Sequence, residues 1–210
     1  MTDVLTDTGL KFFGTMTASI SHELKNRFAI VNEQAGLLTD FVRMAERGRE
    51  LDPERLMRLG ESLKKQVSLA DDLLGHMNHF SHSVDQAACE TDIAAVVACI
   101  AGLARRTADR RNALLDLRLP ETPPMAHTSG FLLMNLIWIL LDGAMGPGTD
   151  SRSLTLSCES SPEGTVVRMD GAAPDLLQQA VAAATDLSHE LGAQVSMDPD
   201  CQSVSVLLPR

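Results

Sequence analysis

The sequence predicts an α+β protein with an N-terminal antiparallel helical hairpin, residues 1–85, followed by a small α/β sandwich, residues 86–210. Three observations lead to this fold class. Apolar residues recur at steps of three and four over positions 10–48 and again over 56–84, which indicates two long amphipathic helices. Beyond that point the apolar segments are shorter, and some of them alternate as strands do. Composition changes between the two halves as well, since no lysine occurs after Lys65.

The two long helices are expected to pack against each other as a hairpin. Gly48 supplies a stop for the first helix. Asp52 is the expected N-cap of the second helix, with Pro53 at its first helical position. A single partner helix cannot fully cover an apolar stripe of this kind, whereas a second hairpin can. We therefore expect a homodimer, built as a four-helix bundle through residues 9–85.

The second half contains short elements of both kinds. A run that is apolar nearly all round predicts a buried helix over residues 130–145. Two further helices are expected, over residues 93–107 and 175–191. Strands are expected over residues 113–119, 154–159, 165–169, 195–197 and 204–208. Together they predict helices packed on one face of a mixed sheet.

Charge and hydropathy exclude several classes of partner. The formal net charge of −10 argues against nucleic acid, because phosphate backbones reward clustered Lys and Arg. The first residues lack a basic start followed by an apolar core, so no secretory signal is expected. The most apolar stretch, residues 131–141, is too short to cross a bilayer. These features predict a cytoplasmic protein that binds neither nucleic acid nor a membrane.

His22 is the first candidate for chemistry. It lies between Ile20 and Leu24, both on the buried stripe. At about 100° per residue it is rotated by about 200° from each of them, so it points away from the core, and Asn26 shares its face. An exposed neutral imidazole has one ring nitrogen free to attack phosphorus. Glu23 can pair with Arg27 one turn on, or hold the imidazole tautomer and accept its proton.

A family resemblance covers this segment. FFGTMTASISHELKNRFAIVNEQAGLL resembles the phosphoacceptor box of bacterial sensor histidine kinases, which opens a dimerising helical hairpin. The resemblance implies that His22 is phosphorylated, that Glu23 is its adjacent acid and that Asn26 assists dephosphorylation. Arg27 stands where many family members have proline, so a straighter helix is expected. Lys25 and Arg27 are candidate contacts to an acidic receiver pocket. The alternative is that they are solvated helix cations without a role in binding.

The second half resembles the ATP-binding domain of the same family in its order of elements, but its nucleotide motifs fit badly. Asn135 begins like the asparagine box, yet Ile139 and Leu140 stand where an Asn-Ala pair is expected. The segment from Asp170 to Pro174 has one misplaced glycine and leads almost directly into the last helix, with no lid between. Phosphate binding needs close backbone amides or fixed cations, and neither is found where expected. We expect no tightly bound cofactor and no use of ATP.

His76, His79 and His82 are spaced three apart near the end of the second helix. Histidines one turn apart can bind zinc or nickel. Such side chains also suit a helix C-terminus, and we therefore assign no metal. In the antiparallel hairpin, His79 is expected at the same height along the helix axes as His22. There it would either tune the His22 imidazole or lie beside it without a role.

These features predict a histidine phosphotransferase of a bacterial two-component phosphorelay. Its phosphohistidine intermediate at His22 would relay a phosphoryl group between the aspartates of response-regulator receiver domains, which supply the magnesium. Two alternatives stay open. One is a sensor-type autokinase that uses ATP, and the other is a non-catalytic dimeric scaffold or a phosphatase-like pseudokinase. Nucleotide binding separates the first from the rest, and stable label on His22 excludes the scaffold.

Overall fold

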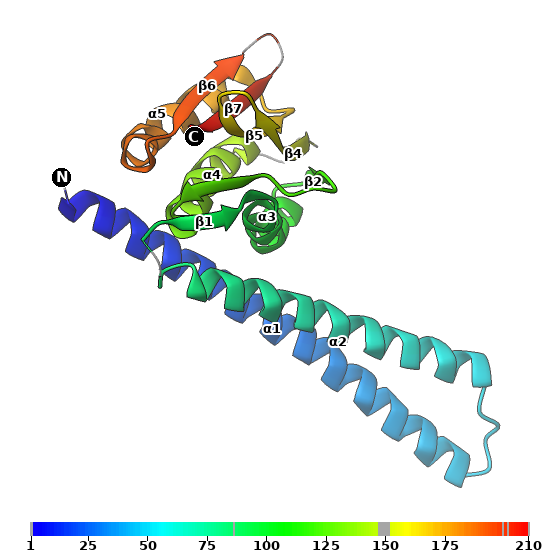
Figure 1. Cartoon of the computed structure of the whole chain (residues 1–210). Helices are drawn as coiled ribbons and strands as arrows, with labels where there is room; N and C mark the ends of the chain where they lie inside the picture. Colours follow the sequence, from blue (N-terminus) through cyan, green and yellow to red (C-terminus); the bar gives the residue numbers. More distant parts are fainter. Residues whose placement is uncertain (1, 86, 147–151, 199, 201, 210) are drawn as a thin grey trace.

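The computed structural model describes the backbone of residues 2–85, 87–146, 152–198, 200 and 202–209, with side chains from Thr8 onward. Two long helices, α1 (Thr2–Glu46) and α2 (Pro53–His82), form the expected antiparallel hairpin (Figure 1). Asp52 caps α2 by accepting a hydrogen bond from the amide of Glu54 at 2.9 Å. Helix α1 passes Arg27 as one uninterrupted element.

The second half is the expected α/β sandwich. Its helices are α3 (Ile93–Arg110), α4 (Gly130–Met145) and α5 (Pro174–Leu191). The main sheet runs in the order β2-β4-β5-β7-β6, from strands β2 (Ala113–Arg118), β4 (Arg152–Ser161), β5 (Gly164–Asp170), β6 (Gln194–Asp198) and β7 (Ser203–Pro209). The β2–β4 pair is parallel and the other pairs are antiparallel, so the sheet is mixed as predicted. The α+β fold class is confirmed.

The structure contains a second, two-stranded sheet that the sequence did not predict. Strands β1 (Cys89–Asp92) and β3 (Met125–Thr128) pair antiparallel beside the main sheet. Both strands are four residues long, and neither carries a run of alternating apolar residues that would mark it.

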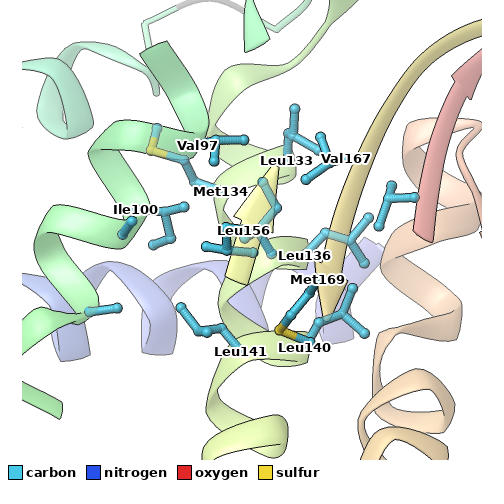
Figure 2. Packing of buried hydrophobic residues seen from close by; sticks show 14 of the residues in the cluster. Val97, Ile100, Leu133, Met134, Leu136, Leu140, Leu141, Leu156, Val167 and Met169 are labelled. Carbon is cyan, nitrogen blue, oxygen red and sulfur yellow. The ribbon is translucent and has the colours of Figure 1, made fainter. Parts of the chain in front are cut away.

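The core of the α/β part lies between helix α4 and the main sheet. In Figure 2, Leu136 and Leu140 of α4 face Leu156 and Met169 of the sheet, and Ile100 of α3 approaches from the side. All five side chains are buried. Helix α4 is thus buried on most of its surface, as its apolar sequence predicted.

The α/β part packs onto one end of the hairpin through a cluster of aromatic rings. Phe80 of α2 lies 5.4 Å from Phe12 of α1 in an edge-to-face contact, and 5.2 Å from Phe13 in a stacked one. Phe131 of α4 completes the cluster at 5.5 Å from Phe12. One continuous buried core therefore contains residues from both sides of the expected boundary at position 85. This contact fixes the hairpin relative to helix α3.

The other end of the hairpin extends away from the α/β part (Figure 1). Along it, large apolar side chains are exposed in the single chain: Phe28, Leu37, Leu38, Val42, Met57, Val67 and Leu74. Several belong to the stripe that the sequence places on the inner face of a dimer.

Among the described residues, no helix is both long and apolar enough to span a membrane.

Candidate phosphoacceptor site

His22 projects from α1 toward solvent beside helix α3. Ile20 is buried and Leu24 packs against the core, so the helix is held with His22 on its outer side. Nη2 of Arg106, from α3, donates a hydrogen bond to Nε2 of His22 at 3.3 Å. A guanidinium group can only donate, so Nε2 is the acceptor in this contact, which corresponds to the tautomer with its ring proton on Nδ1. The nitrogen with the available lone pair is therefore Nε2.

Glu23 joins two arginines beneath the imidazole. Its carboxylate pairs with Arg27 one turn on, which confirms the pairing that the sequence spacing predicts. It also lies 3.8 Å from Nε of Arg106. Arg27 in turn donates to Oε1 of Gln66 on α2, at 3.2 Å. Both arginines and Glu23 are less than one-third exposed, so this network is held more firmly than a surface ion pair.

Asn26 and Lys25 are both exposed on α1. Asn26 follows His22 by one turn and lies on the same helix face. Both side chains are exposed, so one docking partner would reach His22 and Asn26 together. The structure brings His22, Glu23 and Arg27 together with Arg106. Lys25 and Asn26 lie outside this group and are exposed on α1.

A cleft of about 440 Å³ lies next to this network, between α1, α2 and α3. Glu23, Arg27 and Arg106 line its side nearest His22, and Arg105 and Asp109 of α3 also face it. Its lining mixes charged and apolar side chains, and it lies beside the helix turn that carries His22. It gives the arginines room to move without disturbing the core.

His76 of α2 fills the opposite wall of the cleft. Its ring packs against Gly102 of α3 so closely that a Cβ on that glycine would lie 2.4 Å from Nε2 of His76. Burial lowers the pKa of His76 below its ordinary value; His79 and Arg105 lower it further, and Asp72 opposes them. His76 therefore serves the contact between α2 and α3 in its neutral form.

The histidine series does not converge on a metal site in the part of the chain that the structure describes. Nδ1 of His82 contacts Oδ2 of Asp85 at 2.9 Å, near the exposed end of α2. No group of three or more His, Cys, Asp or Glu side chains is placed to hold a metal ion among the described residues.

Arg106 is the site residue that the sequence analysis missed. It lies 84 positions from His22 along the chain. Only the packing of α3 on the hairpin brings the two together. The available signal was weak: an Arg-Arg pair, Arg105 and Arg106, begins the polar last part of a helix whose first part is apolar. Charge at such a position usually marks a solvated face.

The residues expected at a nucleotide site do not fit ATP. Asn135, which would begin the asparagine box, is 1% exposed, inside α4. Helix α5 packs directly on α4, and a Cβ on Gly143 would lie 2.6 Å from Cβ of Ala180. An amide that is almost fully buried in this conformation is not presented to a magnesium ion or a phosphate.

Gly171, the one glycine near the expected second motif, has a backbone role. Its φ of +94° favours glycine, and a Cβ there would lie 2.1 Å from the carbonyl oxygen of Ser153. Strand β5 ends at Asp170 and α5 begins at Pro174, with Ala173 at the N-cap, so the turn is too short for a lid. The glycine is explained by this turn alone.

Several solved structures are similar to the chain. One is the histidine kinase AdeS of Acinetobacter baumannii, 17% identical, which covers 90% of this chain and 97% of its own with a TM-score of 0.49. Another is titled a bacterial phosphotransferase, at 11% identity, 94% and 95% coverage and a TM-score of 0.49. Histidine kinases are also the kind of protein that the segment around His22 resembles. No protein-family model and no curated protein matches the chain.

A third similar structure is the histidine kinase ThkA in complex with the response regulator TrrA. It is 13% identical, covers 95% of this chain and 62% of that chain, and has a TM-score of 0.49. At such identities and scores, the activity of this chain has to be argued from its own residues.

Proposed function

We propose that this protein is a histidine phosphotransferase that carries a phosphoryl group on Nε2 of His22 between receiver-domain aspartates. The observation that carries the proposal is the state of the imidazole. It is exposed on a rigid helix, and the arginine bonded to Nε2 leaves that nitrogen as the one with the lone pair.

The transfer step needs little from the chain beyond alignment. The lone pair of Nε2 attacks the phosphorus of an aspartyl phosphate, and an N–P bond forms. The P–O bond to the aspartate breaks, and its electron pair stays on the receiver's carboxylate. The phosphorylated ring then releases its Nδ1 proton to water. A magnesium ion on the receiver would neutralise charge on the phosphoryl group during this exchange. The reverse step delivers the phosphoryl group to a second receiver.

Receiver domains are proposed as the donors because the geometry around Asn135 and Gly171 argues against ATP. Among the described residues, the amide buried in α4 and the three-residue turn before α5 do not offer the groups that would position a triphosphate. ThkA, one of the similar structures, is titled as a complex with a response regulator. A partner of that class would dock on the open face that His22 and Asn26 share.

The autokinase is kept as a second candidate, because AdeS and QseC, both similar in structure, are titled histidine kinases. A dimeric scaffold without catalysis is the third. The homodimer itself is part of this proposal. Its support is the row of exposed apolar side chains along the free end of the hairpin, which a second hairpin would cover.

One experiment separates the three. The full chain is incubated with labelled ATP, and separately with a panel of receiver domains phosphorylated by labelled acetyl phosphate. His22→Ala is run beside it, with His127→Ala as a control at an exposed histidine of β3. Acid-labile label that comes only from a receiver and is lost only in His22→Ala supports the phosphotransferase. Label from ATP alone would make the chain a kinase, and no label at all would favour the scaffold.

A further inference from the structure

We propose that Arg106 is a catalytic residue of the phosphoacceptor site. Its guanidinium binds the phosphoryl group that His22 carries. The inference rests on the proposed function of His22. It gives the α/β part a task in phosphoryl transfer that needs no nucleotide: helix α3 supplies a cation to a histidine on the hairpin.

The guanidinium of Arg106 is placed by two contacts on different atoms. Nη2 donates to Nε2 of His22 at 3.3 Å, and Nε lies 3.8 Å from Oε2 of Glu23. Glu23 is itself fixed from the other side by Arg27. The guanidinium therefore lies beside the Glu23 carboxylate at Nε and is directed at the reacting nitrogen through Nη2.

The contact with the neutral imidazole contributes little by itself, since it is long and exposed. Its chemistry changes when Nε2 is phosphorylated. The lone pair that accepts the hydrogen bond is then used in the N–P bond, and three phosphoryl oxygens stand in its place. A guanidinium fork is suited to such oxygens, which it can bind through two parallel N–H donors. To reach these oxygens, the Arg106 side chain would move by little more than the length of the N–P bond.

The charges of the cluster fit a phosphorylated state. Within the group of Glu23, Arg27 and Arg106, one positive charge is in excess; Asp71, Asp72, Arg105 and Asp109 also line the adjoining cleft. A phosphoryl group adds a negative charge of about 1.5 to 2 at neutral pH. The adjoining cleft gives the Arg106 side chain space to follow it. The guanidinium is already beside Nε2 before the phosphoryl group arrives, so electrostatic stabilisation needs only a short movement of the side chain.

The test compares Arg106→Gln and Arg106→Lys with Arg105→Gln. Arg105 is the neighbouring arginine on the same helix, lines the same cleft and has no contact with His22 among the described residues. The rate of label transfer from a phosphorylated receiver is measured at single turnover. Arg106→Gln should slow it about 10- to 100-fold, which is less than in enclosed sites because His22 is open to water. Arg106→Lys should recover part of the rate, because it keeps the charge and loses the fork.

A second readout does not depend on any receiver. The full-length variants are phosphorylated chemically with phosphoramidate, and the His22 signal is identified in ³¹P NMR by its absence in His22→Ala. Its chemical shift and hydrolysis rate should change in Arg106→Gln and stay at the wild-type values in Arg105→Gln. Equal shifts and equal hydrolysis rates in all three proteins would overturn the role of Arg106. Failure of every receiver to label the wild type would instead refute the proposed function, and the phosphoramidate comparison would still decide on Arg106.

Discussion

Replacing Gly143 by alanine is expected to destabilise the α/β part, although alanine is the better helix former. The added Cβ would lie 2.6 Å from Cβ and 3.3 Å from Cα of Ala180, so helices α4 and α5 would have to separate. Overpacking of this kind costs about 1–3 kcal/mol. The helix propensity of alanine offsets about 1 kcal/mol of it. The net loss of about 1 kcal/mol corresponds to a melting temperature about 2–4 °C lower.

Urea unfolding followed by the fluorescence of Trp138 is the matching assay. Trp138 is the single tryptophan of the chain, it lies on α4, and it packs against the core. Gly130→Ala, in the same helix, is the control, because its Cβ would meet nothing closer than 3.8 Å. Its midpoint should stay at the wild-type value or rise slightly. A midpoint for Gly143→Ala equal to or above that of the wild type would refute the close packing of α4 on α5.

Three further predictions concern pH, thiol reactivity and assembly. The pKa of His76 is lowered in the folded state, chiefly by burial, from its ordinary value of 6.5. As the pH falls through that value, the unfolded state therefore binds more protons than the folded state. The free energy of unfolding should therefore fall as the pH drops from 7.5 to 5.5, and His76→Gln should flatten this dependence in melts at a series of pH values. Burial raises the pKa of Cys99 to about 12 and that of Cys158 to about 11, so mapped alkylation at pH 8 should find both unreactive until the chain is unfolded. Val67→Glu, at an exposed position of the hairpin, should convert the proposed dimer to monomer in light scattering, whereas Lys65→Glu should not; a wild type that is monomeric at tens of micromolar would contradict the dimer.

Periodicity was enough to predict the long elements. The hairpin helices and helix α4, at Gly130–Met145, follow from apolar spacing and from capping residues such as Asp52, because helices of this length bury one continuous stripe. Strands β1 and β3 were missed for the opposite reason. They are short, and their pairing depends on neighbours far along the chain, which local sequence does not report.

The site divides along the same line. The Glu23–Arg27 pair is one helical turn apart and follows from spacing alone. Arg106 reaches His22 because the α/β part packs on the hairpin, where Phe131 of α4 contacts Phe12 and Phe80, a tertiary contact with no local signature. Gly171, the one misplaced glycine of the expected nucleotide motif, has a structural reason that the sequence does not show: its backbone approaches Ser153 closely.

The most direct test of the central claim is a two-step relay in the absence of ATP. Labelled phosphoryl groups are transferred from one receiver to the full chain, the labelled chain is purified, and a second receiver is added with Mg²⁺. The account predicts that the label is located on His22 by tandem mass spectrometry and then leaves for the second receiver, with no label on His22→Ala at either step. Label that maps to another residue, or that stays on His22 and reaches no receiver, would contradict a relay through this histidine.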